Sequence, residues 1–521
     1  DHLDKYDTGF DMPDRVCEKC GTNMNKNGLN IPFATFLGFN GDKEPDIDLN
    51  FAGEYQPIAH KFVGEIFGEE NIFKAGTVAT IAEKTAFGYV KKYEENTGKS
   101  FSNSEELVLA NGCTGTKRTT GQHPGGIIVV PADREIFEFC PVQKPANNRD
   151  AEFITTHFDY HKIDKNLLKL DILGHDVPQM IRHLQDMTGV DPLGIDIADK
   201  KTLSIFTSID ALNIVNPDDY EFKHGTYGIP EFGTNFTRGM LDAIKPKTIS
   251  ALIKISGFSH GTDVWTNNAE DLIKNGVATI DELISCRDDI MNYLMIKGVD
   301  KSNAFKIMEA VRKNKELKQE ELDIMKEHGV PDWYVESCRT LKYLFPRAHA
   351  AAYVMMALRM AWFKVYYPSA FYCAWLSTKI DNFDVNVARG GVEAAKAALS
   401  SLNSEDDDTS AAKKKELKVV YEVIYELLSR GCEFSLPELG VSDPCMFNVV
   451  DDKIKIPFMA VSGVGRSAAI SLAEAYKEGP FLSIDEVQRK TKLSSTNIED
   501  LKACGVFDEL PDSAQVSIFD M

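Results

Sequence analysis

The feature that most constrains this chain is a short alternating run, Asp46-Ile47-Asp48-Leu49-Asn50-Phe51. In a β-strand, successive side chains point to opposite faces, so Asp46 and Asp48 would share one face and the apolar residues the other. The apolar face can be buried in a sheet while the carboxylates open into a cleft. Two close carboxylates repel each other unless a cation lies between them, and Mg²⁺ combines carboxylates with water and substrate phosphates. The alternative is a solvated strand face.

A second run, Leu168-Lys169-Leu170-Asp171-Ile172, alternates in the same way. Lys169 and Asp171 would share one face, backed by the apolar residues on the other. Beside Asp48, this strand would supply a third metal ligand and a phosphate partner, as two-metal phosphoryl transfer needs. A salt-bridged edge strand is the alternative, and the pattern alone leaves open whether the two strands are neighbours.

Length and composition limit the classes of protein that this chain can form. Its 521 residues are too many for one hydrophobic core, so we expect three to five domains. With 43% hydrophobic and 26% charged residues, a wholly disordered chain is excluded. No apolar run approaches the length of a membrane span, and the first residues lack the pattern of a signal peptide. Ten cysteines, mostly scattered, predict a reducing cytoplasm.

The net charge of −21 argues at first against a nucleic-acid partner. Between Ser337 and Ile380, however, there is no Asp or Glu, and the stretch carries six Lys or Arg residues. A basic surface on an acidic chain is therefore possible. The alternative is a buried helix with snorkelling cations.

Four motifs together resemble the PolC-type DNA polymerase III alpha subunits, the family C replicative polymerases of low-GC Gram-positive bacteria. They are Glu44–Phe51, Thr119–Ile127, Asn166–Asp176 and Phe345–Tyr353, and the resemblance covers essentially the whole chain. It implies that Asp46, Asp48 and Asp171 are the catalytic aspartates that hold two Mg²⁺ ions. It also implies that Lys169 faces the incoming triphosphate. His123, within Thr119–Ile127, is interpreted as a structural cap of a tight turn.

The resemblance implies an α+β multidomain fold with a nucleotidyltransferase-like mixed sheet. We expect a partial zinc-binding element at 1–30, a palm at 31–55 and 112–205, a helical thumb at 56–111, helical fingers at 206–430, a helix-hairpin-helix domain at 431–510 and a tail at 511–521. The family's phosphate loop of the palm and its N-terminal domains are missing from the sequence. We therefore expect a C-terminal part, or a short or split form, of such a polymerase.

The resemblance also implies contacts with the substrates. A helix beginning near Ala350 would place basic residues at its N-terminus, where free N–H groups favour phosphate. The expected nucleotide-binding residues of the fingers are Arg347, His349, Tyr353, Arg238 and Arg287, with weaker roles for Lys254 and His260. The lysines expected to bind DNA from the thumb are Lys91 and Lys92.

Cys17-x2-Cys20 has the spacing of half a tetrahedral zinc site. No βαβ pattern surrounds it, which disfavours a redox CxxC. The resemblance implies a second CxxC upstream, which this chain lacks, so Zn²⁺ binding is expected only if another ligand pair completes the site.

The C-terminal region contains Val461–Ile470, where Gly463, Gly465 and Arg466 predict a helix-hairpin-helix that binds duplex backbone through N–H groups. An ordinary helix-entry turn is the alternative, and a degenerate second copy at 493–506 favours the hairpin. In the tail, the set Gln515, Ile518 and Phe519 resembles the peptide with which bacterial polymerases bind the sliding clamp. A frayed terminus would look similar.

The sequence therefore predicts a template-directed DNA polymerase whose partners are primer-template DNA, dNTP, the sliding clamp and other replisome subunits, with no membrane partner. A two-metal nuclease would use the same aspartates on water. A non-catalytic DNA-binding fragment, lacking part of the palm, is the third possibility. A long nucleotide-binding helical region favours the polymerase over the nuclease.

Overall fold

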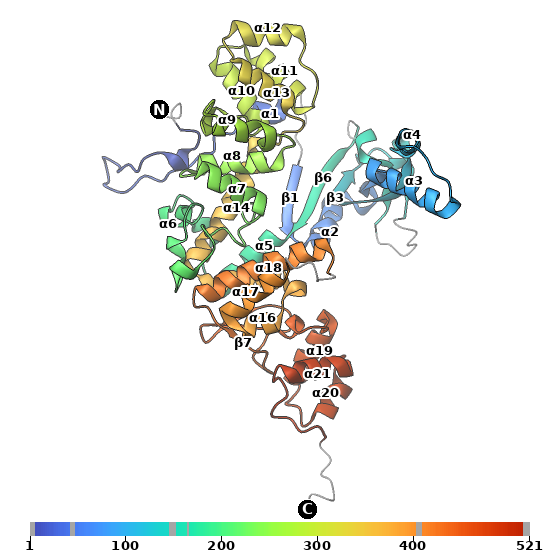
Figure 1. Ribbon diagram of the computed structural model, residues 1–521, viewed down its shortest axis with the longest axis vertical. Helices are drawn as coiled ribbons and strands as arrows, with labels where there is room; N and C mark the ends of the chain where they lie inside the picture. Colours follow the sequence, from blue (N-terminus) through green and yellow to red (C-terminus); the bar gives the residue numbers. More distant parts are fainter. Residues whose placement is uncertain (1–5, 42–46, 145–152, 164–165, 403–408, 514–521) are drawn as a thin grey trace, which may run out of the picture. The chain divides into compact units, whose positions relative to one another are not determined.

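The structure is a computed structural model that describes residues 6–41, 47–144, 153–163, 166–402 and 409–513 (Figure 1). Its contacts divide the chain into two compact units. The smaller unit comprises residues 44–179, and the larger unit comprises residues 1–43 together with 180–521. In the described part of the chain, no helix is both long and apolar enough to cross a membrane.

The smaller unit is built on a six-stranded mixed sheet. Its strand order is β1-β6-β3-β2-β5-β4, so β1 lies at an edge of the described sheet, and Figure 1 shows β1, β6 and β3 side by side. β1 pairs with β6, and β2 with β5, in parallel, while the other neighbours are antiparallel. The strands are β1 (Ile47–Ala52), β2 (Ile72–Thr80), β3 (Lys117–Val129), β4 (Val142–Gln143), β5 (Thr155–Asp159) and β6 (Leu168–His175).

Each face of this sheet has its own apolar core. On one face, helix α2 (Gln56–Phe67) packs Ala59 and Val63 against Leu170 and Ile172 of β6. The core of the other face includes Phe73, Ile128 and Leu167. The expected apolar face of β1 is buried only in part, because Ile47 and Leu49 are 36% and 44% exposed on this edge strand.

The helical structure predicted for 56–111 is interrupted by a strand, although α2 is helical as predicted. Ile72–Thr80 forms β2, whose first five residues are buried and which lies between β3 and β5 in the sheet. A strand that is buried on both faces shows no alternation of apolar and polar residues. The prediction therefore extended the helical pattern of the preceding residues into this strand. Helices α3 (Glu83–Thr97) and α4 (Asn103–Cys113) form a pair with a small core of its own, made of Ala86, Val90 and Ala110.

The larger unit is mostly helical. Helix α5 (Asp176–Thr188) spans the boundary between the units. The other helices up to residue 429 are α1 (Ala34–Leu37), α6 (Lys200–Ser204), α7 (Asn235–Ile244), α8 (Ile249–His260), α9 (Glu270–Lys274), α10 (Arg287–Ile296), α11 (Lys301–Arg312), α12 (Gln319–Glu327), α13 (Asp332–Thr340), α14 (Arg347–Tyr366), α15 (Pro368–Ser377), α16 (Val385–Arg389), α17 (Gly391–Ser401) and α18 (Ala411–Ser429).

The two compact units do not coincide with the predicted palm boundaries at 31 and 205. Residues 31–41 belong to the helical unit, where the Thr35 hydroxyl donates to Asp288 at 3.0 Å and the Phe39 ring lies 6.1 Å from Phe305. Residues 180–205 belong to the same unit. These partners lie more than 200 residues away in sequence, so local pattern carries no signal for them.

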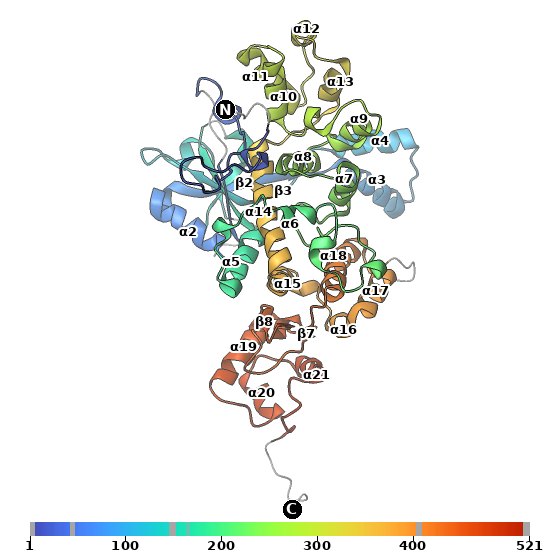
Figure 2. The same cartoon turned by 90° about the vertical axis from the view of Figure 1, so that its left-hand side faces the viewer.

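Helix α14 runs through the helical unit, with α8, α6 and α15 packed on it (Figure 2). It begins three residues earlier than predicted and ends before Pro368, as predicted. Its cations do not form one basic surface, because Lys364 is fully buried and its ammonium lies 2.5 Å from Glu426. Burial lowers the pKa of Lys364 to about 8.

The C-terminal region contains a three-stranded sheet of order β7-β9-β8 followed by three helices. The elements are β7 (Phe434–Ser435), β8 (Asn448–Val450), β9 (Lys453–Lys455), α19 (Arg466–Lys477), α20 (Ile484–Lys490) and α21 (Ser495–Ala503). Gly463 has a φ of +77°, which a residue with a side chain rarely adopts, and Gly465 caps α19.

Candidate active site

Parallel pairing of β1 with β6 sets Asp48 beside Asp171 in register. Registered residues on neighbouring strands point to the same face, so the two carboxylates face the same way. The sequence left the adjacency of these strands open, and the pairing confirms it. Asp46, the third predicted aspartate, lies outside the described residues.

The carboxylate of Asp171 is satisfied on one oxygen only. Its Oδ2 lies 2.9 Å from the ammonium of Lys169, which also lies 4.4 Å from the centre of the Tyr160 ring. Its Oδ1 is buried and has no hydrogen-bond donor among the described residues. Buried carboxylate oxygens nearly always have partners, so this oxygen marks a place where a cation would bind.

His123 lies next to this oxygen but does not satisfy it. Its Nδ1 is 3.5 Å from Asp171 Oδ1, yet the same nitrogen accepts hydrogen bonds from the N–H groups of Gly126 at 2.8 Å and Gly125 at 3.3 Å. A nitrogen that uses its lone pair as an acceptor carries no proton to donate. The ring of His123 caps backbone N–H groups as predicted, but these lie in the irregular strand β3 and not in the predicted tight turn. Its place beside Asp171 was not predicted.

An irregularity in β3 brings His123 to the site. The register between β2 and β3 shifts between Lys74 and Gly76, where the strand partner runs from Ile127 to Gln122. Bulges of this kind re-aim side chains next to functional sites. Gly126 pairs with Asp171, and a Cβ on it would lie 2.9 Å from both His123 Nδ1 and Lys169 Cε. Glycine therefore leaves the room that these two side chains occupy.

The donor set fits Mg²⁺. Two carboxylates on adjacent strands offer hard oxygen ligands, and one of these oxygens has no hydrogen-bond donor within the described part of the chain. Among the described residues, no group of three or more His, Cys, Asp or Glu side chains converges as a metal site. Asp46 would be the third carboxylate and lies outside them.

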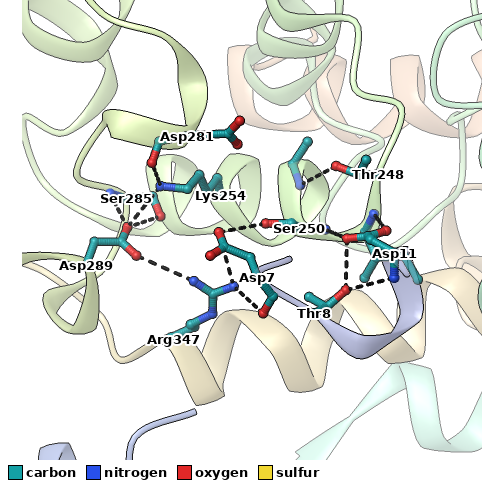
Figure 3. A network of polar contacts seen from close by, with 12 residues as sticks. Asp7, Thr8, Asp11, Thr248, Ser250, Lys254, Asp281, Ser285, Asp289 and Arg347 are labelled. Carbon is teal, nitrogen blue, oxygen red and sulfur yellow. Dashed lines mark hydrogen bonds and ion pairs between the residues drawn. The ribbon is translucent and has the colours of Figure 1, made fainter. Parts of the chain in front are cut away.

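The three predicted fingers arginines are buried in the helical unit, with 9%, 6% and 3% of Arg238, Arg287 and Arg347 exposed. Arg347 reaches Asp289 at 3.6 Å and Asp7 at 3.7 Å, and Figure 3 shows it between them. Its backbone N–H donates to Asp288 at 2.7 Å, so a carboxylate already occupies this end of α14. Direct contact of Arg347 with a triphosphate would require these partners to move.

The carboxylate of Asp289 is fully engaged. It accepts from the backbone and hydroxyl of Ser285 at 2.8 and 2.7 Å and lies 3.7 Å from Lys254. Burial alone would raise the pKa of Asp289, but the charges of Lys254 and Arg347 and the bonds from Ser285 outweigh it and lower the pKa.

Residues 7–11 are tied to α8 by the same network (Figure 3). Asp11 accepts the N–H groups of Ile249 and Ser250 at 2.8 and 2.9 Å, which satisfies two free donors at the helix start. The Ser250 hydroxyl donates to Asp7 at 3.0 Å. Asp7 and Asp11 were not predicted as site residues, because their partners are distant in sequence.

The other two fingers arginines are held by partners within the helical unit. Arg238 donates to Glu422 at 3.1 Å and to the carbonyl of Gly233 at 2.6 Å, and it lies 4.0 Å from the Tyr227 ring. Arg287 donates to the carbonyl of Thr35 at 3.3 Å. Both guanidinium groups therefore join chain segments within the helical unit.

The remaining fingers residues form an aromatic cluster on α14 and α8. His349 lies 4.7 Å from Phe345, 4.6 Å from Tyr353 and 5.3 Å from His260, measured between ring centres. His349 and Tyr353 are half-buried, so one side of the cluster meets solvent. The cluster unites three residues that sequence analysis had named separately.

His260 in this cluster is set up to carry a charge. Its Nε2 lies 2.9 Å from Glu231, and its Nδ1 lies 2.7 Å from the carbonyl of Ser256. Burial lowers the pKa of His260, but the hydrogen bond and charge of Glu231 outweigh it and raise the pKa above its ordinary value. Glu231 itself has a φ of +68°, and nothing in its surrounding sequence predicted this role.

The predicted DNA and zinc residues lie on exposed segments. Lys91 forms ion pairs within the α3–α4 pair, at 2.6 Å to Glu106, while Lys92 is exposed. Cys17 and Cys20 are free thiols on a short hairpin, and the Thr22 hydroxyl, 2.9 Å from Cys20 Sγ, lowers the pKa of Cys20. Two thiols fit half a zinc site.

The hairpin residues and the tail complete the predicted set. The carbonyl of Gly463 accepts from Asn497 of α21 at 2.8 Å, which joins the two predicted copies of the motif. Arg466, the first residue of α19, is exposed. Gln515, Ile518 and Phe519 lie outside the described residues.

Comparison with known families matches these regions in order. Residues 20–105 and 91–174 match the bacterial DNA polymerase III alpha NTPase domain, residues 177–330 match the finger domain of the same subunit, and residues 431–516 match a helix-hairpin-helix motif. The finger match begins near the boundary between the two units. The α+β multidomain fold expected from the sequence is confirmed.

Individual relatives are similar over nearly the whole chain. The DNA polymerase III PolC-type of Caldanaerobacter subterraneus is 51% identical over 514 residues, which cover 99% of this chain and 36% of that protein. The PolC-type enzymes of Oceanobacillus iheyensis and Thermotoga maritima are 50% and 49% identical, with 36% and 38% of their lengths covered. The chain thus spans little more than a third of these relatives, and it belongs to the PolC-type DNA polymerase III family.

Proposed function

We propose that this chain carries the nucleotidyl-transfer centre of a replicative DNA-directed DNA polymerase, with Asp48, Asp171 and Asp46 as its metal-binding carboxylates. The observation that carries the proposal is the register of β1 against β6, which sets Asp48 beside a carboxylate with one unsatisfied buried oxygen. In a pair of carboxylates that only stabilises the strands, each buried oxygen would be expected to have a partner.

In this proposal the side chains have distinct roles. Asp48 and Asp171 hold the metal side of the site, and Lys169, already 2.9 Å from Asp171, uses its remaining N–H donors on the incoming triphosphate. Two bound Mg²⁺ ions would supply activation of the primer 3′-hydroxyl and neutralisation of the leaving pyrophosphate. His123 and Gly126 keep the strand geometry around Asp171.

The nucleotide contacts of the fingers are proposed at the aromatic cluster. His349 and Tyr353 are half-buried, as the rest of the cluster is, and imidazole and phenol groups can stack on a base or donate to phosphate. Arg347, Arg238 and Arg287 take part in nucleotide binding only through an exchange of their carboxylate or carbonyl partners. Without exchange, they hold the fingers in shape.

DNA and protein partners are proposed for the exposed segments. Lys92, Gly463, Gly465 and Arg466 would bind the DNA backbone, with Lys91 released from its ion pairs. The tail residues Gln515, Ile518 and Phe519 would bind the sliding clamp, and other replisome subunits would join the whole polymerase. We place the protein in the cytoplasm, with Zn²⁺ at Cys17 and Cys20 when further ligands complete the site.

Primer extension tests the proposal directly. The chain is assayed alone, and within a full-length PolC-type polymerase, on a primer-template with Mg²⁺ and dNTP. Asp48→Asn should abolish incorporation while DNA affinity stays the same. Degradation of the primer by the unaltered protein would favour a two-metal nuclease. Full incorporation by Asp48→Asn would show that this carboxylate is dispensable and would contradict the proposal.

A further inference from the structure

The hydrogen-bond ladder between β3 and β6 stops beside Asp171. The last registered pair is Gly126 with Asp171, and the next residue of β3 beyond it, Gly125, lies opposite Ile172. The N–H of Gly125 donates to His123 Nδ1 at 3.3 Å, within its own strand. The carbonyl of Ile172, directly after Asp171, therefore needs a donor from elsewhere.

Gln56 supplies that donor from outside the sheet. Its Nε2 donates to the carbonyl of Ile172 at 2.7 Å and to the carbonyl of Pro124 at 3.0 Å. One amide NH₂ group thus joins both strands at the point where their own ladder ends. Both partners are acceptors, which fixes the orientation of the amide.

The approach of Gln56 depends on a glycine. A Cβ at Gly174 would lie 3.0 Å from Gln56 Oε1 and 3.2 Å from the Cα of Gly53. Any side chain at position 174 would push Gln56 away from β6. The sequence of β6 is therefore adapted to this contact three residues after Asp171.

A second residue of α2, His60, contacts the same part of the sheet. His60 lies four residues after Gln56, on the same side of the helix, and its ring nitrogens lie 2.6 and 3.3 Å from the buried ammonium of Lys74 in β2. Burial and the charge of Lys74 lower the pKa of His60 to about 4. Hydrogen bonding to the backbone of Ile172 and Gly125 acts in the opposite direction and only partly offsets this. A neutral His60 fits a brace between β2 and the ends of β3 and β6.

We propose that Gln56 is a positioning residue for Asp171, which fixes the end of β6 so that the unsatisfied Oδ1 keeps its place for the metal. Gln56 does not touch the metal or the substrate, and it acts through the backbone of Ile172. The inference rests on the proposed metal site. Groups that orient metal ligands typically change metal affinity by about 10- to 100-fold when removed.

The test is a Mn²⁺ titration of this chain followed by electron paramagnetic resonance. Gln56→Met keeps the length of the side chain and removes both donors, while Gln56→Glu keeps the shape and turns a carboxylate toward the two carbonyls. Glu65→Gln, an equally small change on the exposed side of α2, is the matched control. Both Gln56 variants should bind Mn²⁺ at least about tenfold more weakly than the unaltered chain.

Asp171→Asn and the thermal midpoint separate the possible outcomes. If Asp171→Asn binds Mn²⁺ like the unaltered chain, the proposed metal site itself fails, and the inference with it. If Asp171→Asn loses binding while folded Gln56 variants retain full affinity, only the role of Gln56 is overturned. A purely structural role would lower the midpoint without changing the affinity of the folded protein.

Discussion

Two carboxylates of this chain, Asp171 in the sheet and Asp289 in the helical unit, lie in opposite kinds of surroundings. Asp289 has a donor or a cation for each oxygen, from Ser285, Lys254 and Arg347. Asp171 has one cation for Oδ2 and a buried Oδ1 without a donor among the described residues. Both are only slightly exposed, so burial does not explain the difference.

The difference distinguishes a carboxylate whose partners are complete, Asp289, from one whose partners the proposed metal would complete, Asp171. A buried charge with complete partners is stabilised by the protein alone, whereas an incomplete set costs free energy until a cation completes it. For a charged residue near a predicted site, it therefore matters whether its partners within the protein are complete or incomplete. Arg347 was predicted at the nucleotide from the family resemblance and its place at a helix N-terminus, but its charge is already paired with Asp289 and Asp7.

The largest expected effect is on catalysis at the incomplete carboxylate. Asp171→Asn should lower single-nucleotide incorporation by about 10³-fold, or about 4 kcal/mol of transition-state stabilisation, because the metal loses a charged ligand. Incorporation by a PolC-type polymerase carrying the change measures it, and the circular dichroism melt of this chain should stay nearly unchanged. Normal incorporation would make Asp171 a structural residue like Asp289.

The next effect is on stability at the complete carboxylate. Arg347→Met should destabilise the helical unit by about 3 kcal/mol, because it leaves Asp289 and Asp7 without their shared cation. Urea unfolding followed by tryptophan fluorescence reports this unit, since all four Trp residues lie within 180–521. Arg182→Met removes an exposed ion pair and is the control. Unchanged stability with a raised KM for dNTP would place Arg347 at the nucleotide instead.

A smaller effect concerns the charged His260. Its pKa is raised by Glu231, so the stabilisation is complete below the ordinary pKa of 6.5 and is lost as pH rises through the higher folded value. The helical unit should therefore lose stability as pH rises from 6 through the folded pKa of His260, and His260→Gln should remove this slope. His349→Gln, the neighbouring histidine, should retain it. An equal slope in His260→Gln would assign the titration elsewhere.

The smallest effect is expected at the hairpin. Arg466→Ala should weaken binding to duplex DNA and reduce the slope of log affinity against log salt by about one, because one phosphate contact is lost. Titrations at several salt concentrations measure the slope. Arg489→Ala, an exposed arginine on α20, should leave it unchanged. The same slope in both variants would remove Arg466 from the DNA interface.

The site in the sheet was accessible from sequence because its signals are local. Alternation in 46–51 and 168–172 predicts the face of each acid, and the family resemblance adds that the strands belong together. The unsatisfied oxygen of Asp171, the bulge at His123 and the brace at Gln56 depend on register between strands. No single strand contains that information.

The helical unit was less accessible because its polar contacts join distant segments. Arg347 meets Asp7, 340 residues earlier, so its burial could not follow from the acid-free stretch around it. For the same reason, the sequence did not predict that residues 31–41 belong to the helical unit. In β2, continuous burial removed the alternation that would have identified a strand.

Cleavage of the backbone by bound Fe²⁺ tests the central claim most directly. Fe²⁺ replaces Mg²⁺ in oxygen sites, and with ascorbate and peroxide it cuts the chain close to where it binds. We expect cuts close to residues 48 and 171 in the unaltered chain, and their loss in Asp171→Asn with Asp289→Asn unaffected. Cuts that persist in Asp171→Asn, or that fall only elsewhere, would contradict a metal site between β1 and β6.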